Sequence, residues 1–382
     1  MSIAPTACIV LFRVIRVNLL PRVSPVLTLA AYFSSIICME QVNNILKVID
    51  KASSRTITVF GDYCLDKYLY IDSARDEPSV ETGLTAYQVD RQKLYPGAAG
   101  TVTNNLRALG AQVRCIGLVG EDGEGYDLLK CLEKIGANTD WMVRSEIIPT
   151  NTYMKPMRAT GNGPYSEMNR LDIRNFKETP RELEDRLIQN LKKALETSQG
   201  VIIIEQYLQR NCAVITDRIR DELAALAVRF PNIFFFADSR GFAGCYRNVI
   251  IKCNQFELPG VIEHENFEGE ESIIPRAKKL LTANACRAVV VTIGAKGALV
   301  FEGAKMARIP AFPVESPLDI VGAGDATNAG VMLGLTLGLT LPEAVLLGGC
   351  VSSITIQQIG VTGTATIEQV QQRLQERRDV VQ

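Results

Sequence analysis

Two carboxylates bracket a glycine-rich turn near the C-terminal end of the chain, in the stretch Asp319-Ile320-Val321-Gly322-Ala323-Gly324-Asp325. The turn Gly322-Ala323-Gly324 carries almost no side chain, so its backbone N–H groups can converge on an anion at the start of the following helix. Asp325 then lies where a carboxylate can take a proton from a hydroxyl that attacks a bound phosphoryl group. Asp319 could hold the same acceptor molecule. The stretch therefore predicts a site of phosphoryl transfer.

A structural interpretation of these residues competes with the chemical one. The Gly-Ala-Gly turn could simply cap a tightly packed helix, with Asp325 as a favourable charge at the helix N-terminus. Short glycine motifs often occur by chance. The two interpretations stay open on this stretch alone, and the rest of the chain must decide between them.

The same stretch resembles the second signature of the ribokinase-like (PfkB-type) carbohydrate kinases, Asp-Thr-Xaa-Gly-Ala-Gly-Asp. In that family the segment supplies an anion hole and a catalytic base, which implies these roles for Gly322, Ala323 and Gly324 and for Asp325. The resemblance also implies ATP as co-substrate and Mg²⁺ as cofactor. Ile320-Val321 stands where the family commonly has Thr, near a monovalent-cation site, so K⁺ is a further candidate.

A glycine-rich segment that begins at Gly97 resembles the family's first signature, the start of a helix that faces the sugar. Small residues let the backbone approach a substrate closely. The resemblance implies substrate contacts for Gly97, Ala98 and Thr101, although the family often has Gly in place of Ala98 and Asn in place of Thr101. The alternative is a helix N-cap that only packs on the sheet; the order of the two signatures favours the substrate role.

Asp66 ends the first predicted strand and matches the acidic residue that binds sugar hydroxyls in these kinases. A carboxylate suits polyol recognition because it can accept hydrogen bonds from two hydroxyls at once. The competing role for Asp66 is a salt bridge in the lid, with Lys67 or Arg75 as the partner.

Two further stretches resemble the nucleotide side of the family's site. Asn254-Gln255-Phe256-Glu257 is similar to the Asn-x-x-Glu motif, which implies that Asn254 lies near the nucleotide phosphates and that Glu257 organises Mg²⁺, usually through water. Because Mg²⁺ keeps several waters and uses the oxygens of substrate phosphates, a single Glu is sufficient. The alternative is a helix-capping Asn with an exposed Glu.

The second stretch, from Thr292 to Ala298, joins two predicted strands and resembles the family's nucleotide loop. The resemblance implies phosphate contacts for Thr292, Gly294 and Gly297. Lys296 is expected to be a solvated charge at the tip of the turn.

Within the family, the heptose 7-phosphate kinases, as in the kinase domain of the ADP-heptose synthesis protein, give the closest pattern. Arg170-Leu171-Asp172 resembles their lid strand, and Asp238-Ser239-Arg240-Gly241 resembles a further segment. Those enzymes carry an Asp-Tyr-x-Lys-Gly stretch, where this chain has Gln206-Tyr207-Leu208-Gln209-Arg210 and so lacks the acid and the lysine. The heptose kinases are therefore relatives by pattern, with a changed substrate-side loop.

Apolar strands alternate with helices of ten or more residues from Thr56 onward. This alternation predicts an α/β fold with a mostly parallel sheet covered on both faces. The resemblance implies a ribokinase-like three-layer sandwich over residues 39–382, and two excursions at about 67–95 and 151–173 are expected to form a small β-sheet lid.

Residues 1–38 differ from the remainder, with no acidic residue before Glu40 and arginines at Arg13, Arg16 and Arg22. A targeting leader would have this composition. The alternative that we favour is a start codon assigned too early, with Met39 as the true first residue.

The composition limits the class of partner. Lys and Arg number 41 against 42 Asp and Glu, so net charge gives no support to a nucleic-acid or membrane partner. His264 is the single histidine, in a polar stretch where we expect a solvated loop. The ten cysteines include no Cys-x-x-Cys pair, which indicates reduced thiols and a cytoplasmic location.

These residues together predict an ATP- and Mg²⁺-dependent kinase that phosphorylates a hydroxyl of a sugar or sugar phosphate. Two alternatives remain: a nucleoside or other small-alcohol kinase of the same fold, and a catalytically silent sugar- or nucleotide-binding protein. Apolar and aromatic faces on the lid, with Tyr68, Tyr70, Tyr87 and Tyr153, suggest a homodimer formed through the lid.

Overall fold

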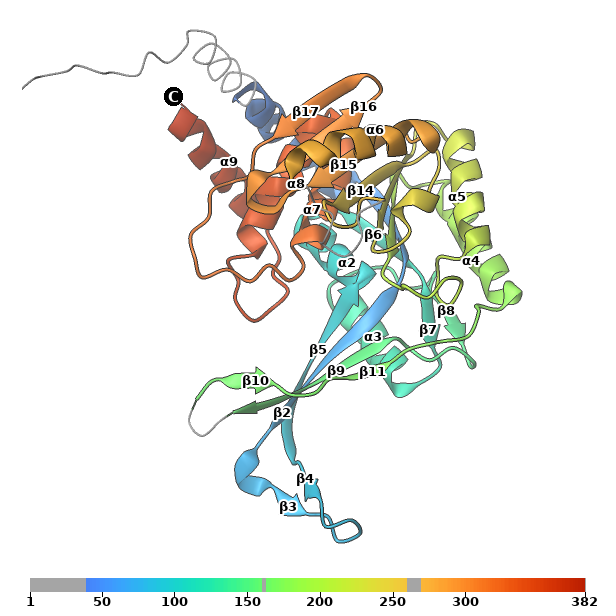
Figure 1. Ribbon diagram of the computed structural model, residues 1–382, viewed down its shortest axis with the longest axis vertical. Helices are drawn as coiled ribbons and strands as arrows, with labels where there is room; N and C mark the ends of the chain where they lie inside the picture. The colour runs from blue at the N-terminus through green and yellow to red at the C-terminus, as the bar shows by residue number, and fades with distance from the viewer. Residues whose placement is uncertain (1–38, 160–162, 260–268, 382) are drawn as a thin grey trace, which may run out of the picture.

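An eight-stranded sheet forms the centre of the computed structural model, which describes residues 39–159, 163–259 and 269–381 (Figure 1). Its strand order is β17-β16-β15-β14-β13-β12-β1-β6, parallel from β15 to β6 and antiparallel at the β17 edge. The strands are β1 (Thr56–Gly61), β6 (Gln112–Ile116), β12 (Gly200–Glu205), β13 (Phe234–Ser239), β14 (Ile250–Asn254), β15 (Ala288–Thr292), β16 (Ala298–Glu302) and β17 (Lys305–Ile309). The predicted mostly parallel sheet is confirmed.

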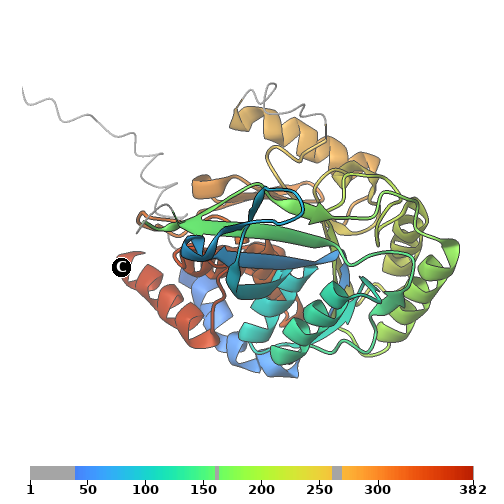
Figure 2. The same cartoon turned by 90° about the horizontal axis from the view of Figure 1, so that it is seen from below.

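Helices cover both faces of this sheet. One set comprises α2 (Ala99–Ala108), α3 (Gly123–Lys134), α7 (Ala323–Thr336), α8 (Leu341–Thr355) and α9 (Ile367–Val381), and the other comprises α4 (Arg181–Ala194), α5 (Asp217–Arg229) and α6 (Ile273–Ala283). Figure 2 shows α6 on one side and α2 with α3 on the other. Side chains alternate along β15, where Val290 joins the core beneath α7 and α8 while Val289 and Val291 join the core beneath α6. The structure is thus the predicted three-layer sandwich.

A second, smaller sheet projects from the body and forms the predicted lid (Figure 1). Its strands are β2 (Tyr63–Ile71), β5 (Val89–Ala98), β9 (Thr152–Ala159), β10 (Tyr165–Glu167) and β11 (Leu171–Ile173), and a short hairpin of β3 (Glu77–Pro78) and β4 (Thr85–Ala86) lies at its far tip. β9 pairs in parallel with β2 and antiparallel with both β10 and β11. The two excursions along the chain therefore meet in one sheet.

The first strand ends earlier than predicted, and Asp66 lies within a lid strand. β1 ends at Gly61, whose φ is +147° and where an added Cβ would lie 2.1 Å from the Ile204 carbonyl oxygen. Only glycine fits this bend, and the chain enters β2 two residues later. Asp66 thus belongs to the lid sheet.

Three other elements differ from the predictions. A strand expected over 113–119 is divided between β6 and β7 (Leu118–Gly120), and β7 pairs with β8 (Val143–Ser145). The helix expected to open within residues 96–100 and to run through Leu109 is α2, which ends at Ala108, and the edge strand β17 was not predicted. Residues 39–48 are helical, while His264 and the segment 1–38 lie outside the described residues. Among the described helices, none has the length and apolar character needed to span a membrane.

Candidate active site

The two predicted signature segments lie against each other at one end of the sheet. Gly322 caps α7 with φ +80° and ψ 2°, a left-handed conformation that favours glycine. A Cβ added there would lie 2.6 Å from Thr362 Cγ2 and 3.5 Å from Cγ2 of Thr101, a residue of α2. The glycine turn is therefore fixed directly beside the start of α2, which the sequence predicts as the substrate side.

Asp325 lies in the first turn of α7, half-buried, with its pKa raised to about 7. Burial is the main cause, and the carboxylate of Asp238 adds to it, while Lys252 acts in the opposite direction. Asp66 and Glu257 raise the pKa further through their charges. A carboxylate with a pKa near neutrality suits general base catalysis, because it can both take and release a proton at working pH.

A buried cation lies beneath the glycine turn. Lys252 Nζ lies 2.8 Å from Asp238 Oδ2 and 3.1 Å from the position that a Cβ on Gly324 would occupy. Asn328 of α7 donates to the same carboxylate oxygen at 2.6 Å. Burial acts to lower the pKa of Lys252, but the carboxylate of Asp238 outweighs it and the pKa is raised, so the ammonium keeps its charge. This cation can help to neutralise an anion held at the turn.

Lys252 was missed in the sequence analysis, although the sequence carries a signal for it. A lysine at the end of the apolar run Val249-Ile250-Ile251, on a strand expected to be buried, needs a carboxylate partner. That partner is Asp238, which stands opposite Lys252 in the register of β13 and β14. Asp238 and Lys252 come together through the parallel pairing of β13 and β14, which cannot be derived from the sequence pattern.

On the acceptor side, Gly97 allows Asp66 to approach the backbone. A Cβ at Gly97 would lie 2.5 Å from Asp66 Oδ2 and 2.6 Å from Cys64 Sγ. The other oxygen of Asp66 pairs with Lys155 Nζ at 2.7 Å. Asp66 thus forms a salt bridge within the lid, but the predicted partners, Lys67 and Arg75, are wrong because the partner is Lys155.

Both predicted partners of Asp66 are occupied elsewhere. Lys67 pairs with Glu124 at 3.3 Å, and Arg75 pairs with Asp72 at 2.9 Å. Lys155 comes from β9, a strand that is distant in sequence and becomes a neighbour of β2 only through the parallel pairing in the lid.

Ala98 and Thr101 take up the positions expected of them at the start of α2. Ala98 is the residue before the helix, with φ +53° and ψ −116°, a conformation that glycine adopts far more easily. Thr101 is buried, and its hydroxyl donates to the Pro96 carbonyl at 3.4 Å. Contact of either residue with a substrate stays a prediction.

Asp319 accepts hydrogen bonds from two backbone N–H groups, one at Val321, next to the glycine turn, and one at Gly360. Its Oδ1 accepts a hydrogen bond from the Val321 N–H at 3.1 Å, and its Oδ2 accepts one from the Gly360 N–H at 3.0 Å. Both carboxylate oxygens are thus committed to backbone groups. The predicted contact of Asp319 with the acceptor stays a prediction.

The predicted nucleotide-side residues gather at the ends of β14 and β15, where Asn254 stands opposite Thr292. Asn254 and Glu257 hold each other, since the Asn254 N–H donates to Glu257 Oε2 at 2.8 Å and the Glu257 N–H donates to Asn254 Oδ1 at 3.0 Å. Gly294 is exposed with φ +54° and open space where a Cβ would be. Gly297 has φ +87° and would place a Cβ 2.0 Å from the Ile309 carbonyl oxygen, so it is also needed for packing.

The charges around the turn suit a bound divalent cation. Burial and the neighbouring Asp238 raise the pKa of Glu257, while Lys252 acts against them. Asp238, Glu257 and Asp325 thus repel one another with one lysine among them. A magnesium ion would relieve this repulsion, and Glu257 has an oxygen, Oε1, that the Asn254 contact leaves available.

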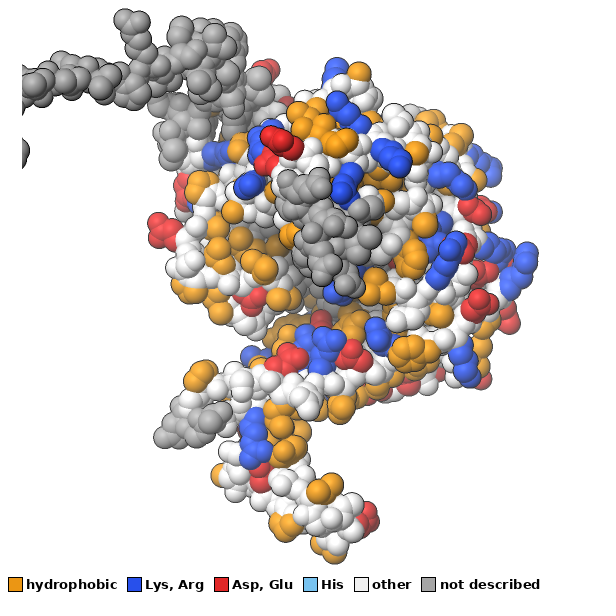
Figure 3. Space-filling model, in the orientation of Figure 1, with side chains coloured by type: hydrophobic (Ala, Val, Ile, Leu, Met, Phe, Trp, Pro, Cys, Tyr) orange, Lys and Arg blue, Asp and Glu red, His pale blue; other side chains and the backbone are white. Residues whose placement is uncertain are grey.

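Asp325, beside the glycine turn, and Asp66, on the lid, lie close enough for their charges to interact. Figure 3 shows an indentation between the body and the lid, with acidic and basic side chains along the lid rim. A small molecule bound there could touch Asp66 and the start of α2 on one side and the start of α7 on the other. In the described part of the chain, no group of three or more His, Cys, Asp or Glu is arranged to hold a metal.

The sequence pattern of the pfkB family carbohydrate kinases matches residues 56–368, which include every residue of this site. The chain belongs to the pfkB family of carbohydrate kinases. Membership in this family supports a phosphotransferase, and ATP is the co-substrate that the family implies.

Curated pfkB-family relatives are much longer than the matched region. The chain is 27% identical over 322 residues to "Bifunctional protein HldE" of Hyphomonas neptunium, an alignment that covers 84% of this chain and 63% of the relative. It is 26% identical over 321 residues to the protein of the same name from Coxiella burnetii, covering 83% of this chain and 63% of the relative. The chain thus spans less than two thirds of these relatives.

Solved structures of two other kinases share the fold. Ribokinase from Arabidopsis thaliana, determined with ribose and ATP, superposes with a TM-score of 0.61 at 19% identity and covers 84% of this chain and 98% of its own. Phosphofructokinase-2 from Escherichia coli, in complex with potassium, superposes with a TM-score of 0.63 at 18% identity. The alignment covers 85% of this chain and 99% of phosphofructokinase-2. At these identities the likeness supports the ribokinase-like fold, and no more than the fold.

Proposed function

We propose that this pfkB-family chain transfers the γ-phosphoryl group of ATP to a hydroxyl of a sugar or sugar phosphate, in the manner of a heptose-phosphate kinase. The observation that carries the proposal is Asp325, a carboxylate with a pKa near 7 in the first turn of α7, next to a glycine turn and a buried lysine. The similarity to the two reported relatives, both named "Bifunctional protein HldE", supports a heptose-phosphate acceptor.

In the proposed reaction, Asp325 takes the proton of the acceptor hydroxyl as the oxygen attacks the γ-phosphorus. The bond from that phosphorus to the β,γ-bridging oxygen breaks, and ADP leaves with the charge. The backbone N–H groups of Gly322-Ala323-Gly324 and the Lys252 ammonium stabilise the negative charge on the moving phosphoryl group. Asp325 then releases its proton to solvent.

The remaining site residues orient the two substrates. Asp66 would accept hydrogen bonds from acceptor hydroxyls above Gly97, and Asn254, Thr292 and Gly294 would border the nucleotide phosphates. A magnesium ion held through Glu257 would neutralise the phosphate oxygens of ATP. K⁺ remains a candidate near Ile320 and Val321, in view of the potassium complex of phosphofructokinase-2.

A substrate screen tests the proposal. Purified full-length chain with ATP and MgCl₂ is incubated with sugars, sugar phosphates and nucleosides, and ADP and phosphorylated product are both measured. We expect product with at least one sugar or sugar phosphate, and heptose 7-phosphate is the first to try. Product only with nucleosides would favour the alternative acceptor, and binding of ATP and sugar without product would favour a silent binding protein.

A further inference from the structure

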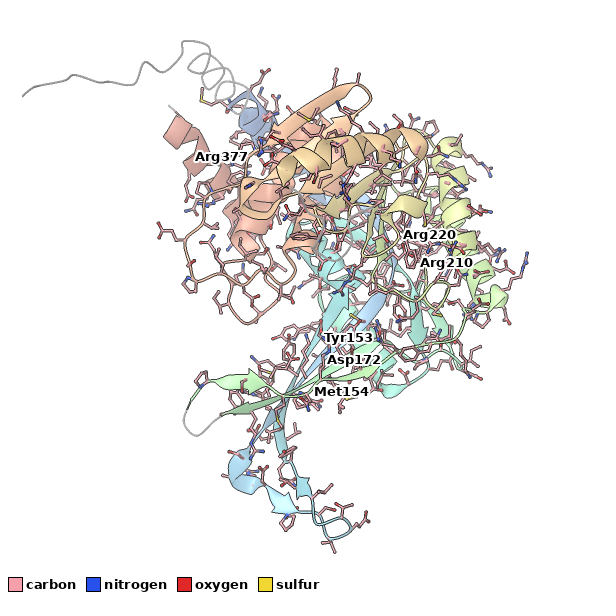
Figure 4. The ribbon with its side chains drawn as sticks, viewed as in Figure 1. Tyr153, Met154, Asp172, Arg210, Arg220 and Arg377 are labelled. Atoms are coloured by element: carbon pink, nitrogen blue, oxygen red, sulfur yellow. The ribbon has the colours of Figure 1, made fainter. Side chains whose placement is uncertain are left out.

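Arg174 lies where the lid joins the body. It directly follows β11, whose residues pair with the start of β9, including Asp172 with Tyr153 and Ile173 with Thr152. Figure 4 shows Tyr153 and Asp172 on these neighbouring lid strands, next to the body. Arg174 is half-buried rather than fully exposed to solvent.

The guanidinium of Arg174 lies over the ring of Phe176, with Cζ 5.4 Å from the ring centroid. Its Nε is buried without a hydrogen bond, and no ion pair to the side chain is present in the described part of the chain. The nearest carboxylate along the strand, Asp172, already binds Arg170 through both oxygens, at 2.6 and 2.9 Å. A buried donor of this kind is costly unless something else binds it.

The backbone around Arg174 is fixed, so the charge is held in place. The N–H of the next residue, Asn175, donates to the Tyr207 hydroxyl at 3.1 Å, and its side chain donates to the Cys212 carbonyl at 2.9 Å. Tyr207 is itself tied to the body, since its N–H donates to Asp62 Oδ2 at 3.2 Å. A guanidinium at this position is preorganised toward an incoming group.

Tyr153 connects Arg174 to the acceptor side of the site. It stands opposite Asp66 across the β2–β9 pair and opposite Asp172 across the β9–β11 pair. Burial and the nearby Cys64 raise the pKa of Tyr153, and the charge of Arg174 partly offsets them. Cys64 lies against Gly97 beside Asp66, so the charge of Arg174 acts on a tyrosine next to the predicted acceptor contacts.

Two other cations, one on the lid and one in the loop after β12, are already paired. Lys155 is bound to Asp66 at 2.7 Å, and Arg210, labelled on the body in Figure 4, is bound to Asp217 at 2.8 Å. The loop after β12 carries the neutral residues Gln206 and Gln209, so no carboxylate from it compensates Arg174. Arg174 differs from these two cations because its buried Nε has no hydrogen-bond partner among the described residues.

We propose that Arg174 binds a phosphate ester carried by the acceptor, at the end of the molecule away from the hydroxyl that receives the new phosphoryl group. A guanidinium presents paired N–H donors that match two phosphate oxygens and keeps its charge at all working pH values. This inference rests on the proposed sugar-kinase function and adds the residue that selects a phosphorylated acceptor over the parent sugar.

Calorimetric binding tests the inference independently of turnover. Full-length chain with MgCl₂ and a non-hydrolysable ATP analogue is titrated with matched pairs, sedoheptulose 7-phosphate with sedoheptulose and fructose 6-phosphate with fructose. We expect the wild type to bind at least one phosphate ester tenfold or more tightly than its parent. Arg174→Gln should bring the two affinities within about threefold, and Arg174→Lys should keep part of the preference.

Two controls accompany this titration. Arg181→Gln removes an exposed arginine at the start of α4, which has no ion pair in the described residues, and should keep the wild-type preference. Affinity for the ATP analogue should be unchanged in Arg174→Gln, which shows that the variant is folded.

The outcomes separate this inference from the proposed function. A preference that survives in Arg174→Gln overturns the inference, as does a wild type that binds and phosphorylates parent sugars as well as their esters; in both cases the sugar-kinase proposal stands. A wild type that neither binds nor phosphorylates any sugar or ester overturns the proposed function and the inference with it.

Discussion

Asp325 combines two properties that a surface carboxylate does not have together. It sits at a helix N-terminus, which favours negative charge, yet burial and three neighbouring carboxylates raise its pKa to about 7. The opposing effect comes from Lys252, which is itself fixed by Asp238. The pKa of the candidate base therefore depends on a small set of residues, and it can be tested by pH.

The rate should fall as the pH is lowered through neutrality. Only the ionised form of Asp325 can take a proton, and its pKa of about 7 means that this form is lost progressively below pH 7. We expect kcat/KM with saturating MgATP to show an acidic limb with a midpoint near 7, measured from pH 5.5 to 9. A rate that stays level down to pH 5.5 would contradict the assigned pKa.

Ala98→Gly should stabilise the protein. Ala98 has φ +53° and ψ −116°, and the strain of such a conformation is about 1–3 kcal/mol for a residue with a Cβ. The extra freedom of glycine in the unfolded chain offsets about 0.4–1 kcal/mol of this. Urea unfolding should therefore show a gain of roughly 1 kcal/mol.

Ala99→Gly is the matched control, because Ala99 is the first residue of α2, and glycine there should reduce stability by about 0.5–1 kcal/mol. Equal losses in the two variants would mean that Ala98 is not strained.

At the scale of elements, a buried network ties the ends of β12 and β13 to α5. Arg220 and Glu205 form an ion pair at 2.8 Å with side chains only 3% and 2% exposed. The hydroxyls of Ser239 and Tyr246 donate to the other oxygen of Glu205, at 2.7 and 2.8 Å. These contacts fix the base of the loop that begins at Gln206, on the substrate side of the site.

Arg220→Met should be strongly destabilising. The change leaves Glu205 buried without its cation, and removal of one partner of a buried pair typically costs about 3–5 kcal/mol. Arg229→Met, an exposed change on the same helix, should cost less than about 0.5 kcal/mol. Equal urea midpoints for the two variants would show that the Glu205 network does not support the fold.

Local sequence patterns predict elements well where one residue type dominates. The buried strands β12 and β15 and the helix after the Gly322 turn are continuous apolar or small-residue runs, and they appear where expected. Asp66 was misplaced because Gly61 bends the chain against Ile204, a residue that is distant in sequence. β17 was missed because its residues, Lys305 to Ile309, mix charged and apolar side chains and are mostly exposed, as befits an edge strand.

Some residues of the candidate site can likewise be predicted from local sequence, and others depend on contacts between distant parts of the chain. Asp325 and the glycine turn are a contiguous motif, so they could be predicted from the sequence. Pairing between strands brings Lys252 to Asp238 and Lys155 to Asp66. It leaves the buried Nε of Arg174 without a hydrogen-bond partner. Which charges stay unpaired is a property of the folded chain.

At the scale of the whole molecule, the lid is the part with the least support from the body. It extends away from the central sheet (Figure 1), and it exposes large apolar and aromatic side chains. Those exposed by 40% or more on the lid are Val80, Leu84, Tyr87, Val89, Tyr165 and Leu171. Exposed patches of this kind are commonly covered by a partner.

We expect the lid to bury these side chains against the lid of a second copy. Light scattering of the full-length chain at micromolar concentration should therefore give the mass of a dimer, about twice 41.9 kDa. Leu171→Asp should shift the equilibrium toward the monomer because it places a charge on the exposed face. A monomeric mass for the wild type would contradict a lid-mediated dimer.

The central claim, that Asp325 is the base of a sugar-directed phosphoryl transfer, is tested most directly by one comparison. Wild type and Asp325→Asn are incubated with γ-labelled ATP, MgCl₂ and the best acceptor, and label in the sugar product is counted together with ATP affinity. We predict that the variant binds ATP within about threefold of the wild type and loses at least about 1,000-fold in product formation. Product formation by Asp325→Asn at a rate close to the wild type would contradict the assignment.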